Sequence, residues 1–125
     1  MGKFSAGIAG YAKRAGVSIG RAVADVCMGT AIRTIDKTPK DKGTAQGNWF
    51  AKINSVSNET SETRTEAEAI LDATNTAQKA SGNIFYLTNN LDYIRKLEYG
   101  WSKQAPNGML RLSIAETENA LKGFK

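Results

Sequence analysis

Residues 84–112 read IFYLTNNLDYIRKLEYGWSKQAPNGMLRL, and this stretch passes from a strand pattern to a helix pattern and then to a loop. Its first five residues are rich in β-branched and aromatic side chains, which predicts a buried strand over 83–89. Leucine and isoleucine then recur at helical spacing, so a short helix is expected over 91–99, with Asn90 as its cap. Gly100 suits the left-handed position that ends a helix.

The first part of the chain has apolar residues at steps of three or four, from Phe4 to Val26. This spacing puts them on one stripe and predicts a single long helix over 1–36. Its glycines each lower helix propensity by about 1 kcal/mol relative to alanine, so we expect outside contacts to stabilise it. Gly16 and Gly20 would allow a close approach by the sheet or by a neighbouring subunit. Alternatively, the helix simply docks on the core of its own domain.

The middle of the chain alternates between loops and short elements. Pro39 and Gly43 predict a turn that ends the first helix. A strand is predicted over 44–56, in which Trp49 and every second residue after it face the core. Polar residues then predict a loop, which leads to a helix over 66–80 whose acidic side chains are expected mostly on the outer face.

The last segment is ambiguous, because its apolar residues from 109 to 114 fit both a strand and a helical face. A helix over 106–122 is favoured, since Pro106 can stand near its start and residues 115–122 are good helix formers. Together the elements predict one α+β domain covering residues 1–125. We expect the long N-terminal helix and the C-terminal helix to pack on a small antiparallel sheet.

Positive charge is concentrated in the first half of the chain. Residues 1–60 contain nine Lys or Arg against four Asp or Glu, whereas the remaining residues contain eight of each sign. A basic surface of this kind attracts nucleic acid, an acidic protein or a phosphate-rich surface. A basic face that is merely solvated is the simpler alternative.

Several kinds of catalytic and binding site lack the residues that they need. The sequence has no His, which removes the usual general base and a common zinc ligand, and it has no glycine-rich phosphate-binding motif. Cys27 lies near the apolar stripe of the first helix, where an inert buried thiol is expected. Glu68 and Asp72 are four residues apart, but nothing else completes an acid–base or metal site around them. We therefore expect no enzymatic activity, no cofactor, no metal and no small-molecule substrate.

The apolar residues near the N-terminus predict neither a membrane span nor a signal peptide. The charge-free run from Phe4 to Ala12 is far shorter than the roughly 20 residues that a spanning helix needs. Lys13, Arg14 and Arg21 interrupt what would be the apolar core of a signal peptide. A single cysteine fits a protein made in a reducing cytoplasm.

The loop around Gly100 mixes rigid aromatic area with cationic and amide side chains, a combination enriched where proteins bind each other. The residues that we expect to contact other proteins are Glu98, Tyr99, Gly100, Trp101, Ser102, Lys103, Gln104, Pro106 and Met109. For Trp101, closure over the core is an equal alternative. Stacking on single-stranded nucleic acid is disfavoured, because this aromatic-rich half has no net positive charge.

Two motifs resemble signatures of the small neck, or tail-completion, proteins of long-tailed bacteriophages. The pattern TPxDTGxxxxxW is matched by Thr38, Pro39, Asp41, Gly43 and Trp49, with Lys42 where the family more often has Thr. The pattern NxxxYxxxLEYGxSxQAPxGM is matched by Asn89, Tyr93, Leu97, Glu98, Tyr99, Gly100, Ser102, Gln104, Ala105, Pro106, Gly108 and Met109. The second motif is the more specific, and the order of the two agrees with the family.

The resemblance implies a structural virion protein without enzymatic activity, made in the cytoplasm of the bacterial host. It would assemble at the head–tail junction as a ring of identical copies and contact other neck and tail proteins. A ring needs two different surfaces on each subunit. We expect the Glu98–Met109 loop to supply one, and either the first helix or the Lys37–Lys42 loop to supply the other.

The basic half adds an expectation about DNA. Lys37, Lys40 and Lys42 would face the path of the genomic DNA through the neck and make passing contact with it, in a salt-dependent manner. The alternative to the structural role is a small basic nucleic-acid-binding module built on the same lysines.

Overall fold

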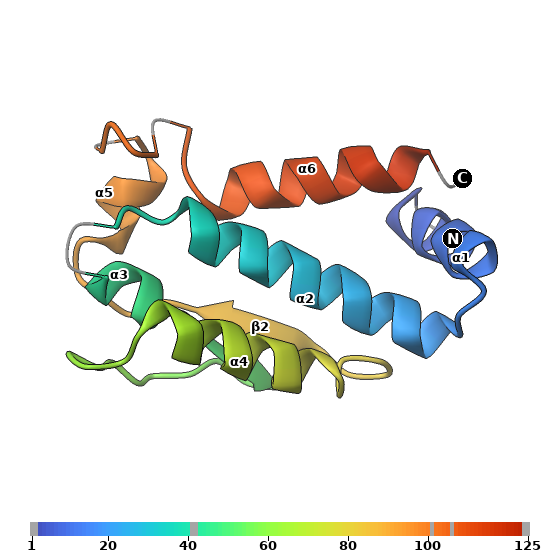
Figure 1. Ribbon diagram of the computed structural model, residues 1–125, viewed down its shortest axis with the longest axis horizontal. Coiled ribbons are helices and arrows are strands. Elements are labelled where there is room, and N and C mark those ends of the chain that lie inside the picture. Colours follow the sequence, from blue (N-terminus) through green and yellow to red (C-terminus); the bar gives the residue numbers. More distant parts are fainter. Residues whose placement is uncertain (1–2, 41–42, 101, 106, 124–125) are drawn as a thin grey trace.

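The long helix α2 (Ile19–Lys37) runs through the middle of the molecule, and the other elements are arranged around it (Figure 1). The computed structural model describes residues 3–40, 43–100, 102–105 and 107–123. In chain order the elements are α1 (Lys3–Ala15), α2, α3 (Thr44–Gly47), β1 (Phe50–Ile53), α4 (Glu66–Ala77), β2 (Phe85–Thr88), α5 (Ile94–Glu98) and α6 (Leu110–Lys122). Helices combined with a two-stranded antiparallel sheet confirm the predicted α+β class.

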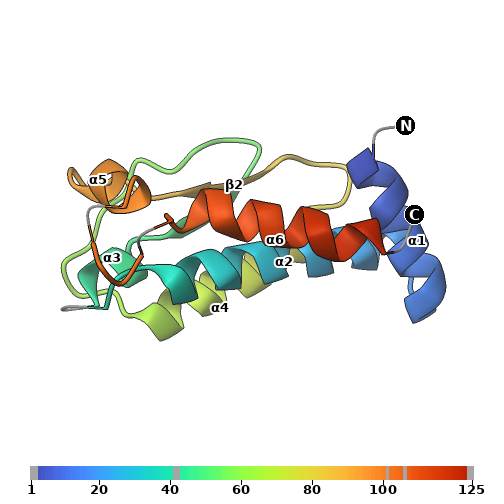
Figure 2. The same cartoon turned by 90° about the horizontal axis from the view of Figure 1, so that it is seen from above.

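The prediction of a single helix over 1–36 is wrong, because the chain bends by 110° between α1 and α2 (Figures 1 and 2). Gly16 has a φ of +69°, and the amides of Gly16 and Val17 bond back to carbonyls in the last turn of α1. Ser18 then caps α2 by accepting a hydrogen bond from the Arg21 amide at 3.1 Å. Within the described residues, no single helix has the length and apolar composition of a membrane span, and only the bent pair α1 and α2 reaches both together.

The predicted strand over 44–56 is only partly right. Residues Thr44–Gly47 form the short helix α3, and the strand covers only Phe50–Ile53. The side-chain amides of Gln46 and Asn48 donate to backbone carbonyls of α2 and α3 at 3.3 and 2.7 Å. Both residues are buried, and a strand at this position would separate them from those partners.

The two strands pair in antiparallel register, with Ile53 of β1 opposite Phe85 of β2. The strand predicted over 83–89 is confirmed in its central residues. Ala51 of β1 and Phe85 of β2 pack against the core, whereas Lys52, the residue that follows Ala51, is exposed. The period of two that the sequence shows after Trp49 is therefore real.

Helix α4 packs on α2 and β1, and it is shorter by three residues than the predicted helix over 66–80. A capping box between Thr65 and Glu68 fixes its start. The side chains that it buries are small and let α2 approach closely. They are Ala69, Ala73 and Ala77.

Asp72 of α4 does not lie free on the outer face, as we predicted for the acidic residues of this helix. Its carboxylate accepts hydrogen bonds from the Ala51 amide at 2.9 Å and from Arg64 at 2.8 Å. Arg64 also donates to two backbone carbonyls just before β1. Asp72 and Arg64 therefore connect the outer edge of β1 to α4. Because Arg64 belongs to the predicted loop over 55–65, they connect this loop to α4 as well.

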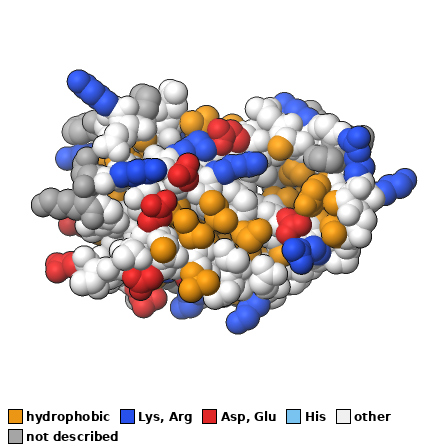
Figure 3. All heavy atoms as spheres, viewed as in Figure 1, with side chains coloured by type: hydrophobic (Ala, Val, Ile, Leu, Met, Phe, Trp, Pro, Cys, Tyr) orange, Lys and Arg blue, Asp and Glu red, His pale blue; other side chains and the backbone are white. Residues whose placement is uncertain are grey.

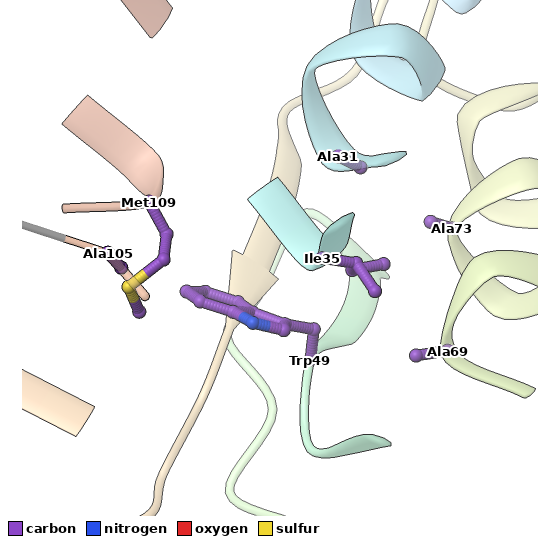
Figure 4. Packing of buried hydrophobic residues seen from close by; sticks show 7 residues of the cluster. All are labelled: Ala31, Ile35, Trp49, Ala69, Ala73, Ala105 and Met109. Carbon is purple, nitrogen blue, oxygen red and sulfur yellow. The ribbon is translucent and has the colours of Figure 1, made fainter. Parts of the chain in front are cut away.

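Trp49 lies at the centre of the core (Figure 4). Its side chain is 4% exposed, which confirms the prediction that it is buried. One side of the indole meets Ile35 of α2, and the far end of the ring points toward Met109. The indole nitrogen donates to Oγ1 of Thr38 at 2.9 Å, so its one polar group is satisfied inside the core.

The C-terminal elements are shorter than predicted: α5 covers Ile94–Glu98 instead of 91–99, and α6 begins at Leu110 instead of 106. The preference for helix over strand in the last segment is confirmed. Asn90 does not cap α5, since its side-chain amide donates to the carbonyls of Ser57 and Glu59 in the loop between β1 and α4. Gly100, with a φ of +86°, has the predicted left-handed conformation.

Helix α6 packs mainly on α1 and α2, whereas α4 is the helix that covers β1. At the crossing of α1 and α6, a Cβ on Gly7 would lie 2.8 Å from that of Leu121. A groove lies between the C-terminal helix and β2, and residues of both elements line it.

Two glycine substitutions should separate close packing from helix propensity. Gly47→Ala should lower the free energy of unfolding by about 3 kcal/mol, because the new Cβ would lie 1.8 Å from the carbonyl oxygen of Arg64. Gly29→Ala in α2 meets no atom within 4 Å and should raise it by about 0.5 to 1 kcal/mol. Urea denaturation of both variants measures this. Equal effects would show that the close contact at Gly47 is unimportant.

Candidate interaction surface

Two segments that are far apart in the sequence meet at one end of the molecule. We define the corner as residues 37–40 together with the loop over 98–109. The backbone amide of Lys40 donates to Oε1 of Gln104 at 2.8 Å, a contact between residues 64 positions apart. The end of α2, α5 and the start of α6 lie side by side here in both views (Figures 1 and 2). Residues from the two sequence motifs therefore form one structural unit.

Glu98 closes the loop of the corner by capping α6. Its carboxylate accepts hydrogen bonds from the backbone amides of Met109, Leu110 and Arg111 at 3.1, 2.9 and 3.1 Å. These are amides that the first turn of a helix leaves without partners, and a negative charge is favourable at this end of a helix. The Arg111 guanidinium adds an ion pair at 3.0 Å and a bond to the Glu98 carbonyl at 2.7 Å.

These contacts set the charge state of Glu98. Partial burial of the carboxyl pushes its pKa upward, but the hydrogen bonds from Leu110, Arg111 and Met109 favour the ionised form. The bonds prevail and hold the pKa of Glu98 below its ordinary value. At neutral pH the loop is therefore closed by an ionised carboxylate.

The inner side of the corner is packed. Met109 and Ala105 are buried in one cluster with Trp49, and Pro39 in the chain segment after α2 is also buried. A Cβ on Gly108 would lie 2.4 Å from the carbonyl oxygen of Glu98, so this turn is closed by direct backbone approach. Met109 was predicted to contact a partner, but its side chain has no exposed surface in this chain. It supports the loop from below.

The outer side of the corner is formed by Tyr99, Lys103 and Gln104. Tyr99 is 66% exposed, and the Arg111 guanidinium lies 4.7 Å from the centre of its ring. Such a cation–π contact orients the ring at little entropic cost to a later binding step. Ser102 shapes the turn, because its hydroxyl accepts a hydrogen bond from the Gln104 amide at 3.1 Å.

The structure thus divides the predicted contact residues. Tyr99, Lys103 and Gln104 are exposed, Gly100 and Ser102 are half-buried, and Glu98 acts within the fold. Trp101, Pro106 and Lys42 lie outside the described residues. Sequence reasoning missed Arg111, which lies 13 positions from its partner Glu98, and no local signal connects the two.

The lysines that were predicted to face DNA have carboxylate neighbours. Lys37 forms an ion pair with Glu116 of α6 at 2.6 Å, and Lys40 lies 3.7 Å from Asp36. On the face shown in Figure 3, cationic and anionic side chains are interleaved and do not gather into a basic patch. Local neutralisation of this kind weakens a long-range attraction for DNA.

Cys27 is half-buried in α2, and burial raises the pKa of its thiol. A raised pKa reduces the thiolate fraction and hence the reactivity of the sulfur. Among the residues that the structure describes, no group of three His, Cys, Asp or Glu is arranged to hold a metal ion.

Comparison of this chain with protein-family models, with curated proteins and with solved structures finds no match.

Replacing Glu98 should open the corner in a pH-dependent manner. Glu98→Gln should lower the free energy of unfolding by about 1 to 2 kcal/mol at pH 7, because a neutral amide caps α6 less well. The folded-state pKa is depressed, so the carboxylate stabilises the chain above its unfolded-state pKa of about 4.3 and loses that effect as the pH falls through the folded value.

Denaturation curves of wild type and variant at several pH values measure this effect. The difference should be full at pH 6 to 7 and should vanish under strongly acidic conditions. The matched control is Glu118→Gln, an exposed acid on the same helix, which should change little at either pH. A difference for Glu98→Gln that does not change with pH would contradict the role of its charge.

Proposed function

We propose that this protein is a structural component of a tailed-phage virion, placed at the head–tail junction as a tail-completion or neck protein. It acts through protein–protein contacts with other neck and tail proteins and with further copies of itself, and it carries out no bond-making chemistry. The proposal begins from the two motifs that resemble that family. It does not rest on composition or fold class, which many unrelated proteins share.

The observation that carries the proposal is the meeting of the two motifs at the corner. Trp49 and Thr38 of the first motif are hydrogen-bonded at 2.9 Å, and Trp49 packs on Met109 of the second. Gln104 of the second motif accepts from the backbone of Lys40 within the first. Two unrelated chance matches would have no reason to form one packed unit. Their contact supports a shared role for both motifs.

The outer side of the corner has the properties of a binding surface. Tyr99 offers exposed aromatic area that Arg111 already orients, and Lys103 and Gln104 of the same loop are exposed as well. Interface hot spots are enriched in such aromatic and arginine side chains. The buried underside keeps this surface in one conformation, which reduces the ordering cost of association.

A ring of identical copies needs a second surface elsewhere on the subunit. Residues 37–40 lie at the same corner as the loop, so they belong to the first surface. The remaining candidate is the glycine-bearing helix pair at the other end of the chain. On α2, Gly29 has no neighbouring atom within 4 Å of the Cβ position, which leaves room for the backbone of another subunit.

Truncation of the exposed aromatic side chain should separate assembly from folding. Tyr99→Ala should weaken association with copies of the chain or with the adjoining neck proteins at least tenfold, while the free energy of unfolding changes by less than about 1 kcal/mol. The matched control is Leu71→Ala, which removes a side chain that is 60% exposed on α4, a helix that contributes no residue to the corner.

Sedimentation velocity of the purified chain, alone and mixed with the adjoining neck proteins, measures the association. Incorporation into particles is measured by complementation of a phage that lacks the gene. If Tyr99→Ala assembles like wild type, or if Leu71→Ala is equally defective, the corner is not the contact surface. A wild-type chain that is absent from purified particles would end the proposal itself.

A further inference from the structure

Strand β2 has one edge that pairs with β1 and one that does not. In an antiparallel pair, opposite residues alternate between those that exchange hydrogen bonds and those whose backbone groups point outward. The amide of Asn54 donates to the carbonyl of Ile84 at 2.8 Å, so this pair is of the bonded kind. With the observed register, Tyr86 is bonded to β1 as well, while the backbone groups of Phe85 and Leu87 point away from it.

The two outer edges of the sheet are treated differently by the fold. On β1, the outward amide of Ala51 donates to the Asp72 carboxylate at 2.9 Å, and α4 covers this side. On β2, the outward amides and carbonyls of Phe85 and Leu87 have no hydrogen-bond partner within the described part of the chain. Proteins normally cover or disrupt an open strand edge, since it is a template for pairing with another chain.

An apolar groove of about 450 Å³ runs beside this open edge. Phe85 and Leu87 of β2 form one wall, Ile114 of α6 forms the other, and Val26 and Cys27 of α2 form the floor. None of the described residues that line it is charged. The two views place α6 and β2 along different sides of α2, with β2 behind α4 in Figure 1 (Figures 1 and 2).

The groove has the form of a missing strand position. The next strand of a sheet lies about 4.8 Å from the edge, and it would here lie over the apolar floor. Residues of α6 line the other side of the groove. A second copy that offered its own β2 would bring its β1 toward α6 as well, so a single added segment is the simpler occupant.

We propose that this groove binds a single extended segment of another protein, which adds to the sheet as a third strand beside β2. The backbone of the segment supplies alternating carbonyls and amides to the free groups of Phe85 and Leu87, which only an extended chain can do. The inference stands on the strand edge and the groove, and it does not depend on the role at the head–tail junction.

The lining determines the chemistry of the segment. Successive side chains of a strand point to opposite faces, so every second residue of the segment meets the floor. Because that floor is apolar and uncharged, these residues must be apolar and uncharged as well. The residues between them face solvent and are polar. The segment is therefore a chain terminus or a long arm with strict alternation over about four to six residues.

The test uses a displayed library of random nine-residue peptides, selected on the purified chain. The selected binders should alternate between apolar and polar residues, and the tightest is then synthesised. Adding it should shift the amide resonances of Phe85 and Leu87 and protect them from hydrogen exchange. It should also slow alkylation of Cys27 by iodoacetamide, because Cys27 lies in the floor.

A second experiment tests whether the peptide pairs with β2 through its backbone. Methylation of every second amide of the peptide should abolish binding in one register and leave it nearly unchanged in the other, because only alternate amides face β2. Ile114→Asp should weaken binding at least tenfold, since it places a charge in the groove wall. Leu71→Asp, an exposed aliphatic residue on the opposite helix, is the control and should bind as wild type.

Circular dichroism verifies that both variants fold, and the Cys27 protection needs no variant. The proposal is overturned if the library yields no alternating binder, if both methylation patterns are tolerated, or if Leu71→Asp weakens binding as much as Ile114→Asp. It is also overturned if the chain alone forms dimers in sedimentation that Ile114→Asp dissolves. In that case a second copy occupies the groove.

Discussion

The position of the Trp49 indole is the constraint on which the rest of this structure depends. Ten of the fourteen buried apolar residues in the described part of the chain are alanine, so only four of the fourteen have large side chains. Trp49 touches the end of α2 through Ile35, and the loop before α6 through Met109. Its nitrogen also bonds to Thr38, where α2 ends. One side chain thus joins its own segment to the end of α2 and to the loop before α6.

An alanine-rich core has a structural consequence. Small side chains let α2 and α4 approach closely, but they bury little apolar area per residue. Large apolar side chains also remain on the surface, among them Ile114 beside the groove. Single exposed apolar residues are normal on a protein surface, but a continuous apolar groove often marks a binding site. The groove beside β2 is a surface of the second kind.

The corner and the groove differ in the way they could bind. The corner has internal contacts, since Glu98 and Arg111 form an ion pair and Met109 is buried on its inner side, and it presents side chains for recognition. The groove presents backbone groups above an apolar floor, and its specificity comes only from the alternation of the bound segment. A subunit with two different surfaces can contact two different neighbours at once. The role that we propose at the head–tail junction requires this of the subunit.

Local sequence patterns were sufficient where a short segment determines its own conformation. The β-branched and aromatic run gives β2, the polar run after Ile53 gives a loop, and the good helix formers after 114 give α6. The burial of Trp49 and the left-handed Gly100 also follow from sequence alone. The break between α1 and α2 could have been predicted from Gly16 and Ser18, but the apolar period continues across it and hid the two caps.

Other features depend on residues that meet only after folding. Glu98 caps a helix that begins 12 positions later, and Gln104 binds the backbone of Lys40 from 64 positions away. Asp72 is one of several acidic residues on α4, a pattern typical of a solvated helix face. Its carboxylate nevertheless accepts a hydrogen bond from the backbone amide of Ala51 in β1. The sequence by itself determined the class of fold and the two motifs, because these depend on periodicity and residue type. Tertiary structure decided which motif residues face outward and left the edge of β2 open, because both depend on which elements become neighbours in space.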